Sequence, residues 1–107
     1  MTPQGYGYFG PPGTFTQMAL QAWRPAAGGE HTAYDSVDST LAAVRSGEVE
    51  AGVVPIENSV EGGVTATLDN LATGDPLVVI GEVLVPITFV LAARAGTRLE
   101  DVTAIGT

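Results

Sequence analysis

Hydrophobic residues along the chain form two kinds of pattern, which are short continuous runs and groups with helical spacing. The runs at residues 6–9 and 51–54 predict strands, and residues 30–34 fit a further strand. The uniformly apolar run at 51–54 is typical of a strand buried on both faces. Helical spacing predicts three helices, from residue 14 to about 23, from about 36 to 47, and from 65 to near 74. Strands that alternate with helices favour βαβ units, so we predict an α/β fold with a largely parallel sheet.

Polar and glycine residues mark the ends of these predicted helices. Thr14 followed by Gln17 fits a capping box at the start of the first helix. Ser36 or Asp38 is expected to cap the second helix, and Gly47 to end it.

The third predicted helix begins with Thr65 and Thr67, which we interpret as capping or surface groups. After it, residues 74–76 are typical of a crossover. Residues 77–92 are rich in β-forming residues, but Pro86 indicates an edge, a bend or two strands in sequence. Residues 99–102 fit a short helical turn, and residues 104–106 the start of another strand.

Composition narrows the possible ligands. The formal net charge is −8, from 12 acidic residues and four basic ones, all of them arginines. Such a surface repels phosphate backbones, which argues against nucleic-acid binding. An anionic substrate would find few cations here, so backbone amides, helix amino termini or further parts of a longer chain would have to bind it.

Several absences narrow the class of protein further. The sequence has no cysteine, and therefore no disulfide or cysteine-based zinc site. It has no uninterrupted apolar run of about 18 residues and no start typical of a signal peptide, which argues against a membrane span and favours the cytoplasm. His31, the single histidine, has no cysteine or paired carboxylate at ligand spacing. We therefore interpret it as a strand residue and expect no metal site.

Two polar segments follow predicted strands, where open α/β folds bind ligands. In residues 10–16, small residues and a threonine can bring backbone amides against an anion, or simply turn the chain and cap a helix. In residues 55–63, Glu57 can be an acid, a base or an acceptor, Asn58 can donate and accept, and Ser59 can donate. Alternatively, these side chains cap a turn and face solvent. The glycines at 62 and 63 permit close approach of a ligand, or only a flexible loop.

Together the two segments resemble the prephenate dehydratase family. The matching stretches are YFGPPGTFT (8–16), VPIENSVEGGV (54–64) and TLDNL (67–71), and their order and separation agree with the family. The resemblance implies a fold like that of type 2 periplasmic binding proteins. Residues 1–75 would form most of its first lobe, and residues 76–107 would cross over and begin the second. The chain is then expected to be the amino-terminal part of a larger catalytic domain.

The resemblance also implies a lyase of phenylalanine biosynthesis that converts prephenate to phenylpyruvate, with loss of water and carbon dioxide and without a cofactor. The leaving hydroxyl needs a proton, and aromatisation drives the remaining step. Glu57, Asn58 and Ser59 match the site loop of the family and are the expected catalytic residues. Asn58 is the strongest candidate for a direct substrate contact. The expected substrate-binding residues are Thr14, Phe15, Asn58, Ser59, Gly63 and Thr107.

Two features of the family are absent from the sequence. These are the Thr-Arg-Phe motif, to which the catalytic threonine and the substrate-binding arginine belong, and a regulatory ACT domain. The chain alone is therefore expected to be inactive. Open edges of a parallel sheet further predict association into a homo-oligomer. Two alternatives stay open: a non-catalytic lobe that binds or senses small carboxylates, and a dehydratase that acts on arogenate.

Overall fold

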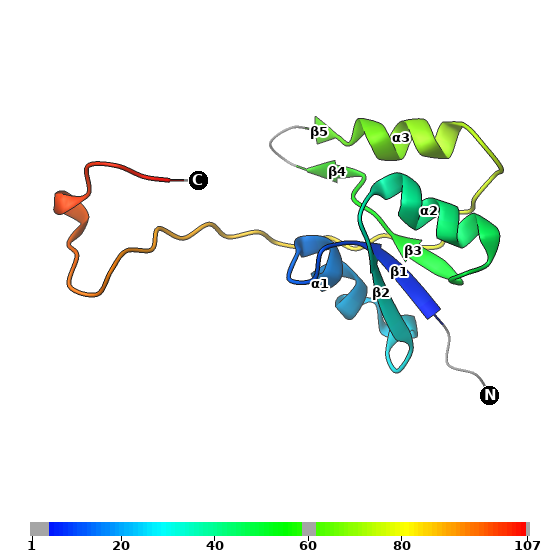
Figure 1. The fold of residues 1–107 in the computed structure, drawn as a ribbon, viewed down its shortest axis with the longest axis horizontal. Helices are drawn as coiled ribbons and strands as arrows, with labels where there is room; N and C mark the ends of the chain where they lie inside the picture. The colour runs from blue at the N-terminus through cyan, green and yellow to red at the C-terminus, as the bar shows by residue number, and fades with distance from the viewer. Residues whose placement is uncertain (1–4, 59–61, 107) are drawn as a thin grey trace.

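The computed structural model describes residues 5–58 and 62–106, which form a small α/β lobe and an extended arm (Figure 1). The lobe contains a parallel three-stranded sheet in the order β2-β1-β3. Its strands are β1 (Gly5–Phe9), β2 (Glu30–Tyr34) and β3 (Ala51–Val53). The predicted α/β class and the predicted parallel sheet are confirmed.

Helix α1 (Phe15–Ala22) covers one face of this sheet. Tyr6 and Tyr8 of β1 point to the same side because strand residues alternate between faces. They pack with Leu20 of α1 and with Ala26 to form a buried core. Ala26 closes the short 3₁₀ helix η1 (Arg24–Ala26), which follows α1.

Helix α2 (Val37–Ser46) packs on the sheet from the opposite side, where its buried residues include Val37 and Leu41. Gly52 of β3 faces this helix, because a Cβ at Gly52 would lie 3.1 Å from Cγ2 of Thr40. The close approach leaves Thr40 without solvent exposure. The lobe therefore has three layers, with the sheet between two helices.

The ends of α2 are those that the sequence predicts. The Ser36 side chain accepts the backbone N–H of Ser39, and the Ser39 hydroxyl accepts the N–H of Ser36, which completes a capping box. Gly47 ends the helix in the left-handed region, at φ +82°.

A two-stranded antiparallel hairpin and a third helix complete the lobe. The hairpin consists of β4 (Glu57–Asn58) and β5 (Gly62–Gly63), and it leads into α3 (Thr65–Ala72), which packs beside α2 (Figure 1). Thr65 lies on the surface, as predicted. The same interpretation of Thr67 is wrong, because its side chain is buried and donates a hydrogen bond to the Pro55 carbonyl.

The environment of β3 differs from the prediction of a strand buried on both faces. Within the described residues β3 pairs only with β1, so it is an edge strand and its side chains are half-buried. A continuous apolar run specifies a strand, but it does not specify how many neighbours the strand has.

The arm differs most from the predicted elements. Residues 77–92 form no strand and residues 104–106 form none either, although the predicted helical turn is present as the 3₁₀ helix η2 (Leu99–Asp101). A strand needs a partner for its backbone hydrogen bonds, and no described strand pairs with the arm. The arm passes Trp23 at Gly81 and then extends away from the lobe (Figure 1). The radius of gyration is consequently 17.3 Å, against about 13 Å for a compact chain of this length.

Candidate functional site

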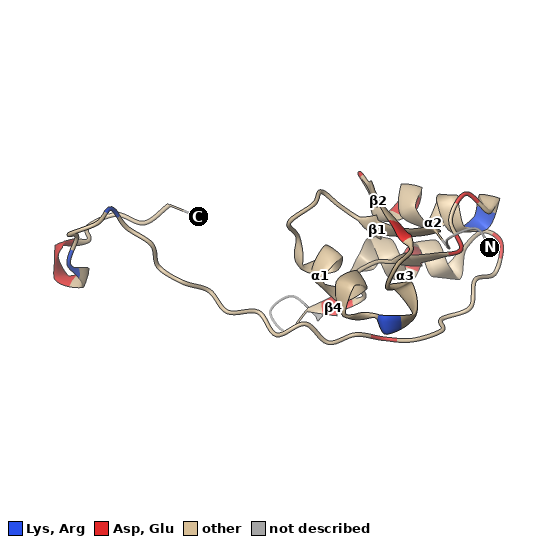
Figure 2. Cartoon of the chain, turned by 90° about the horizontal axis from the view of Figure 1, so that it is seen from below, with Lys and Arg blue, Asp and Glu red and all other residues tan. Residues whose placement is uncertain are grey.

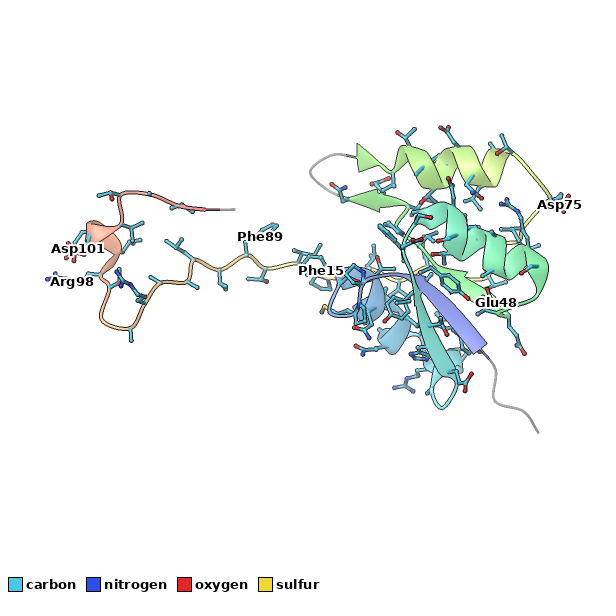
Figure 3. The ribbon with its side chains drawn as sticks, viewed as in Figure 1. Phe15, Glu48, Asp75, Phe89, Arg98 and Asp101 are labelled. Carbon is cyan, nitrogen blue, oxygen red and sulfur yellow. The ribbon has the colours of Figure 1, made fainter. Side chains whose placement is uncertain are left out.

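Both predicted site segments lie at one edge of the sheet. Strands β1 and β3 are adjacent and parallel, so the segments that leave their carboxyl ends start side by side. The first segment, residues 10–16, leads from β1 into the first turn of α1, where Figure 3 labels Phe15. The second, residues 55–63, follows β3 and contains the β4–β5 hairpin, which leads to α3. This edge is where open α/β sheets bind ligands.

The first segment is held tightly by its own backbone. The Gly10 N–H donates to the Tyr34 carbonyl at 2.8 Å, and a Cβ at Gly10 would lie 2.8 Å from the Cβ of Ala33. Gly13 adopts φ +88°, a left-handed conformation that favours glycine. Both glycines therefore have a structural reason. Gly10 allows close packing against Ala33, and Gly13 allows the left-handed backbone conformation.

The capping box predicted at the start of α1 is present in a shifted form. The Thr14 hydroxyl accepts the N–H of Gln17 at 3.4 Å, as predicted. The side-chain Oε1 of Gln17 accepts a hydrogen bond from the N–H of Gly13 at 2.7 Å, instead of from the N–H of Thr14. The amides of Gly10 and Gly13 are engaged. The donors left for a ligand include the amide of Thr14 and the first-turn amides of Phe15 and Thr16, which have no acceptor within the helix. The Phe15 side chain beside them is 47% exposed.

The second segment presents its polar side chains from the hairpin. Glu57 pairs with Gly63 and Asn58 with Gly62 across the two short strands, and both polar residues are exposed. A Cβ at Gly63 would lie 3.1 Å from Cδ1 of Leu68, so glycine lets the hairpin sit close to α3.

Five of the predicted site residues belong to the two segments that follow the carboxyl ends of β1 and β3: Thr14, Phe15, Glu57, Asn58 and Gly63. Ser59 and Thr107, also predicted to be in the site, lie outside the described residues, and their roles stay predictions.

The structure has a hollow beside the first segment that the sequence patterns do not predict. Its volume is about 440 Å³. It lies between the carboxyl ends of β1 and β2, and most of its lining is apolar: Phe9, Gly10, Pro11, Pro12, Ala33, Tyr34 and Asp35. It depends on the packing of Gly10 against Ala33 across two strands, which no local pattern encodes. None of the five described site residues lines it.

Tyr34, which borders this hollow, links β2 to the turn after α2. Its phenol donates a hydrogen bond to the Glu48 carboxylate at 3.1 Å. Burial, followed by the hydrogen bond to Glu48 and by the negative charge of Glu48, raises the pKa of Tyr34 above its ordinary value.

The arginines of the lobe lie away from the candidate site. Arg24 follows the carboxyl end of α1 and Arg45 lies in the last turn of α2. Both helices run back from the site edge, so these residues stand about 12–15 Å along a helix from it. Arg98, on the arm, forms an ion pair with Glu100. Figure 2 shows acidic positions spread over the lobe and few basic ones. In the described part of the chain, the site edge therefore offers hydrogen bonds and no arginine.

Two kinds of feature are absent from the described residues. They contain no group of three or more histidine, cysteine, aspartate or glutamate side chains that could hold a metal ion. None of their helices is long and apolar enough to cross a membrane. His31 is a β2 residue, as predicted, and its Nε2 lies 2.9 Å from the Ala26 carbonyl.

A parallel sheet between helices, with polar segments at the carboxyl ends of two adjacent strands, defines an α/β lobe of the ligand-binding type. The family model of prephenate dehydratase matches residues 6–107. The chain belongs to the prephenate dehydratase family.

Individual relatives agree with this assignment. The chain is 51% identical over 87 residues to prephenate dehydratase of Amycolatopsis methanolica, covering 81% of this chain and 28% of the relative. It is 41% identical over 114 residues to that of Mycolicibacterium vanbaalenii, covering 94% and 36%. A crystal structure of prephenate dehydratase from Arthrobacter aurescens in complex with L-Phe superposes with a TM-score of 0.76 at 55% identity, covering 91% of this chain and 32% of that one. The chain therefore spans about a third of the length of these relatives.

Proposed function

We propose that this chain is the amino-terminal portion of a lyase that converts prephenate to phenylpyruvate, with release of water and carbon dioxide. The observation that carries the proposal is the juxtaposition of two family segments at the carboxyl ends of β1 and β3. Membership of the family supports the reaction class. No cofactor is part of the proposal, because aromatisation drives the loss of carbon dioxide once the hydroxyl leaves.

In the proposed site, Asn58 contacts the substrate directly, since its amide both donates and accepts hydrogen bonds. Glu57 and Ser59 flank it as the other catalytic residues, and Gly63 permits close approach across the hairpin. From the first segment, Thr14 and Phe15 contact the substrate at the start of α1, and Thr107 is a further proposed substrate-binding residue.

The charges of the substrate and of the lobe indicate which substrate groups this portion can bind. Prephenate carries two carboxylates, whereas the arginines of the lobe lie at the far ends of α1 and α2. We therefore propose that this portion orients the substrate through hydrogen bonds and that a cation outside the lobe binds a carboxylate. Arginine is the residue suited to that role, because its guanidinium meets a carboxylate with two parallel hydrogen bonds.

We also propose that the protein is cytoplasmic and assembles as a homo-oligomer. The cytoplasmic assignment rests on the biosynthetic reaction proposed and on the absence of cysteine. The assembly rests on the open edge of β3 and on the large exposed apolar residues of the arm.

A chimera tests the proposed reaction. Residues 1–107 replace the matching segment of the Arthrobacter aurescens protein, about a third of that chain, and phenylpyruvate formation is measured. The chimera is expected to be active, and Asn58→Ala to lower its turnover about a hundredfold or more, the usual cost of removing a hydrogen-bond donor to the reacting group. Gln21→Ala, which removes an exposed amide from α1, is the matched control. Near-normal turnover of the Asn58→Ala chimera would contradict the proposed role of Asn58. Phenylpyruvate formation by residues 1–107 alone would contradict the proposal that a cation outside the lobe is needed to bind a carboxylate.

A further inference from the structure

We infer that Thr67 is a positioning residue for the hairpin that carries Glu57 and Asn58. In the sequence Thr67 and Thr65 are alike, since both lie in the first turn of α3. The structure separates them: Thr65 is exposed, whereas Thr67 is only 1% exposed. The Thr67 hydroxyl donates to the Pro55 carbonyl at 2.6 Å, two residues before Glu57. The inference rests on the proposed function, because it assigns a support to the same site.

The bond to Pro55 fixes the hairpin where it begins. A pair of two-residue strands has too few hydrogen bonds to be stable by itself. The N–H of Val64 donates to the Ile56 carbonyl at 2.9 Å and closes the hairpin at its base. The Thr67 bond lies next to this closure and ties the incoming chain to α3. The direction of β4, and therefore of the Glu57 and Asn58 side chains, follows from these two contacts.

Thr67 can serve as a support only if α3 is itself held in place. At the far end of this helix, the Arg45 guanidinium donates to the side-chain oxygen of Asn70 at 2.6 Å and to the backbone carbonyls of Asn70, Thr73 and Asp75 at 2.9–3.1 Å. The Asn70 amide donates in turn to the Asp38 carboxylate of α2 at 2.8 Å. Helix α3 is thus fastened to α2 at its carboxyl end and to the site segment at its amino end.

A buried hydroxyl with one partner also contributes to folding stability, and this contribution must be separated from positioning. Thr67→Val keeps the volume and shape of the side chain, but it removes the donor and leaves the Pro55 carbonyl without this bond. Thr67→Ser keeps the hydroxyl and removes only a methyl group. Thr65→Val makes the same chemical change at an exposed position of the same helical turn, and is the matched control.

The experiment uses these three variants both in the 107-residue chain and in the Arthrobacter aurescens chimera. In the 107-residue chain, amide hydrogen exchange is measured at Val64, whose N–H closes the hairpin. In the chimera, kcat, KM and the denaturation midpoint are measured with prephenate. Thr67→Val is expected to accelerate exchange at Val64 and to lower kcat/KM between about tenfold and about a hundredfold, the range that follows from misplacing a reacting group by up to 1 Å. Thr67→Ser is expected to restore both quantities, and Thr65→Val to leave both unchanged.

The outcomes separate the inference from the proposed reaction. If the chimera is inactive before mutation, the proposed reaction fails, and exchange at Val64 alone decides whether Thr67 positions the hairpin. If Thr67→Val lowers the denaturation midpoint but leaves kcat/KM and Val64 exchange as in the parent, Thr67 is a folding contact only and the inference is overturned. Failure of Thr67→Ser to restore exchange at Val64 overturns it as well, because the hydroxyl would then not be the group that acts.

Discussion

Tyr34 ties the carboxyl end of β2 to the turn that follows α2, through the hydrogen bond from its phenol to Glu48. Burial and Glu48 raise the pKa of Tyr34, so the folded state holds the phenol proton more tightly than the unfolded chain does. The stability that this gives is complete below the unfolded tyrosine pKa of about 10. It is lost as the pH rises through the higher pKa of the folded state.

Replacing Glu48 with glutamine tests this linkage, because the substitution removes the charge and keeps an acceptor. We expect the Tyr34 pKa to fall toward its ordinary value and the loss of unfolding free energy between about pH 9 and about pH 11 to become smaller. Ultraviolet titration of tyrosinate and denaturant unfolding at the two pH values measure these effects. The sequence has no lysine, which leaves few other groups to titrate in this range, and Tyr34→Phe identifies the Tyr34 contribution. A Glu48→Gln variant with an unchanged or higher Tyr34 pKa would contradict the assignment.

Residue roles were predictable where they depend on neighbours in the sequence. The caps at Thr14 and Ser36 and the left-handed Gly47 follow from local chemistry. The contrast between Thr65 and Thr67 does not, because burial of Thr67 requires Pro55 to lie against α3. The candidate site likewise has a part that was predictable from the sequence and a part that was not. Its residues came from two motifs, whereas their support and the neighbouring hollow depend on contacts between distant segments.

At the scale of elements, the guanidinium of Arg45 joins the carboxyl end of α2 to the carboxyl end of α3. Arg45 lies in the last turn of α2 and donates to two carbonyls near the end of α3. The last carbonyls of a helix have no partner within it and carry partial negative charge, so a guanidinium there satisfies and stabilises them. Arg45 is half-buried, and its Asn70 partner is held by Asp38. The four bonds make Arg45 a structural residue and not a substrate ligand.

We expect Arg45→Met to lower the free energy of unfolding by about 1–3 kcal/mol, the range for losing hydrogen bonds made by a charged group. Arg45→Lys is expected to restore only part of this loss, since an ammonium cannot reproduce the planar fork of donors. Urea unfolding of the two variants measures both effects. Arg24→Met removes an exposed arginine from η1 and is expected to change stability by less than about 0.5 kcal/mol. If Arg45→Met were no more destabilising than Arg24→Met, the four hydrogen bonds of Arg45 would make no net contribution to stability.

The elements that formed as predicted are those whose backbone partners are local or nearby. The three helices satisfy their own hydrogen bonds, and β1 gains two neighbours through consecutive βαβ units. Residues 77–92 have the composition of strands, yet no described strand pairs with them. Composition records the tendency of a segment to enter a sheet, whereas strand formation requires a partner at its edge.

At the scale of the whole molecule, the lobe and the arm bury very different amounts of their apolar side chains. Leu20 is fully buried in the lobe, while Val78, Leu84, Phe89 and Val90 of the arm are 83–91% exposed. The lobe has a core of its own, and the described part of the arm has none. An exposed apolar segment of this size is typical of a surface that other protein covers.

In a solution of this chain alone, the partner available to the arm is a second copy, and among the described strands β3 has one edge without a neighbour. We expect the molar mass from light scattering to rise with concentration toward that of a dimer. Leu84→Asp combined with Val90→Asp should shift the chain toward the monomer, because both substitutions charge the apolar surface that associates. Thr97→Asp with Thr103→Asp is the control, since these exposed arm positions add the same two charges without removing a large apolar side chain. A chain that stays monomeric at the highest concentration reached, or that associates equally well when Leu84 and Val90 are both replaced, would show that the arm is not the associating surface.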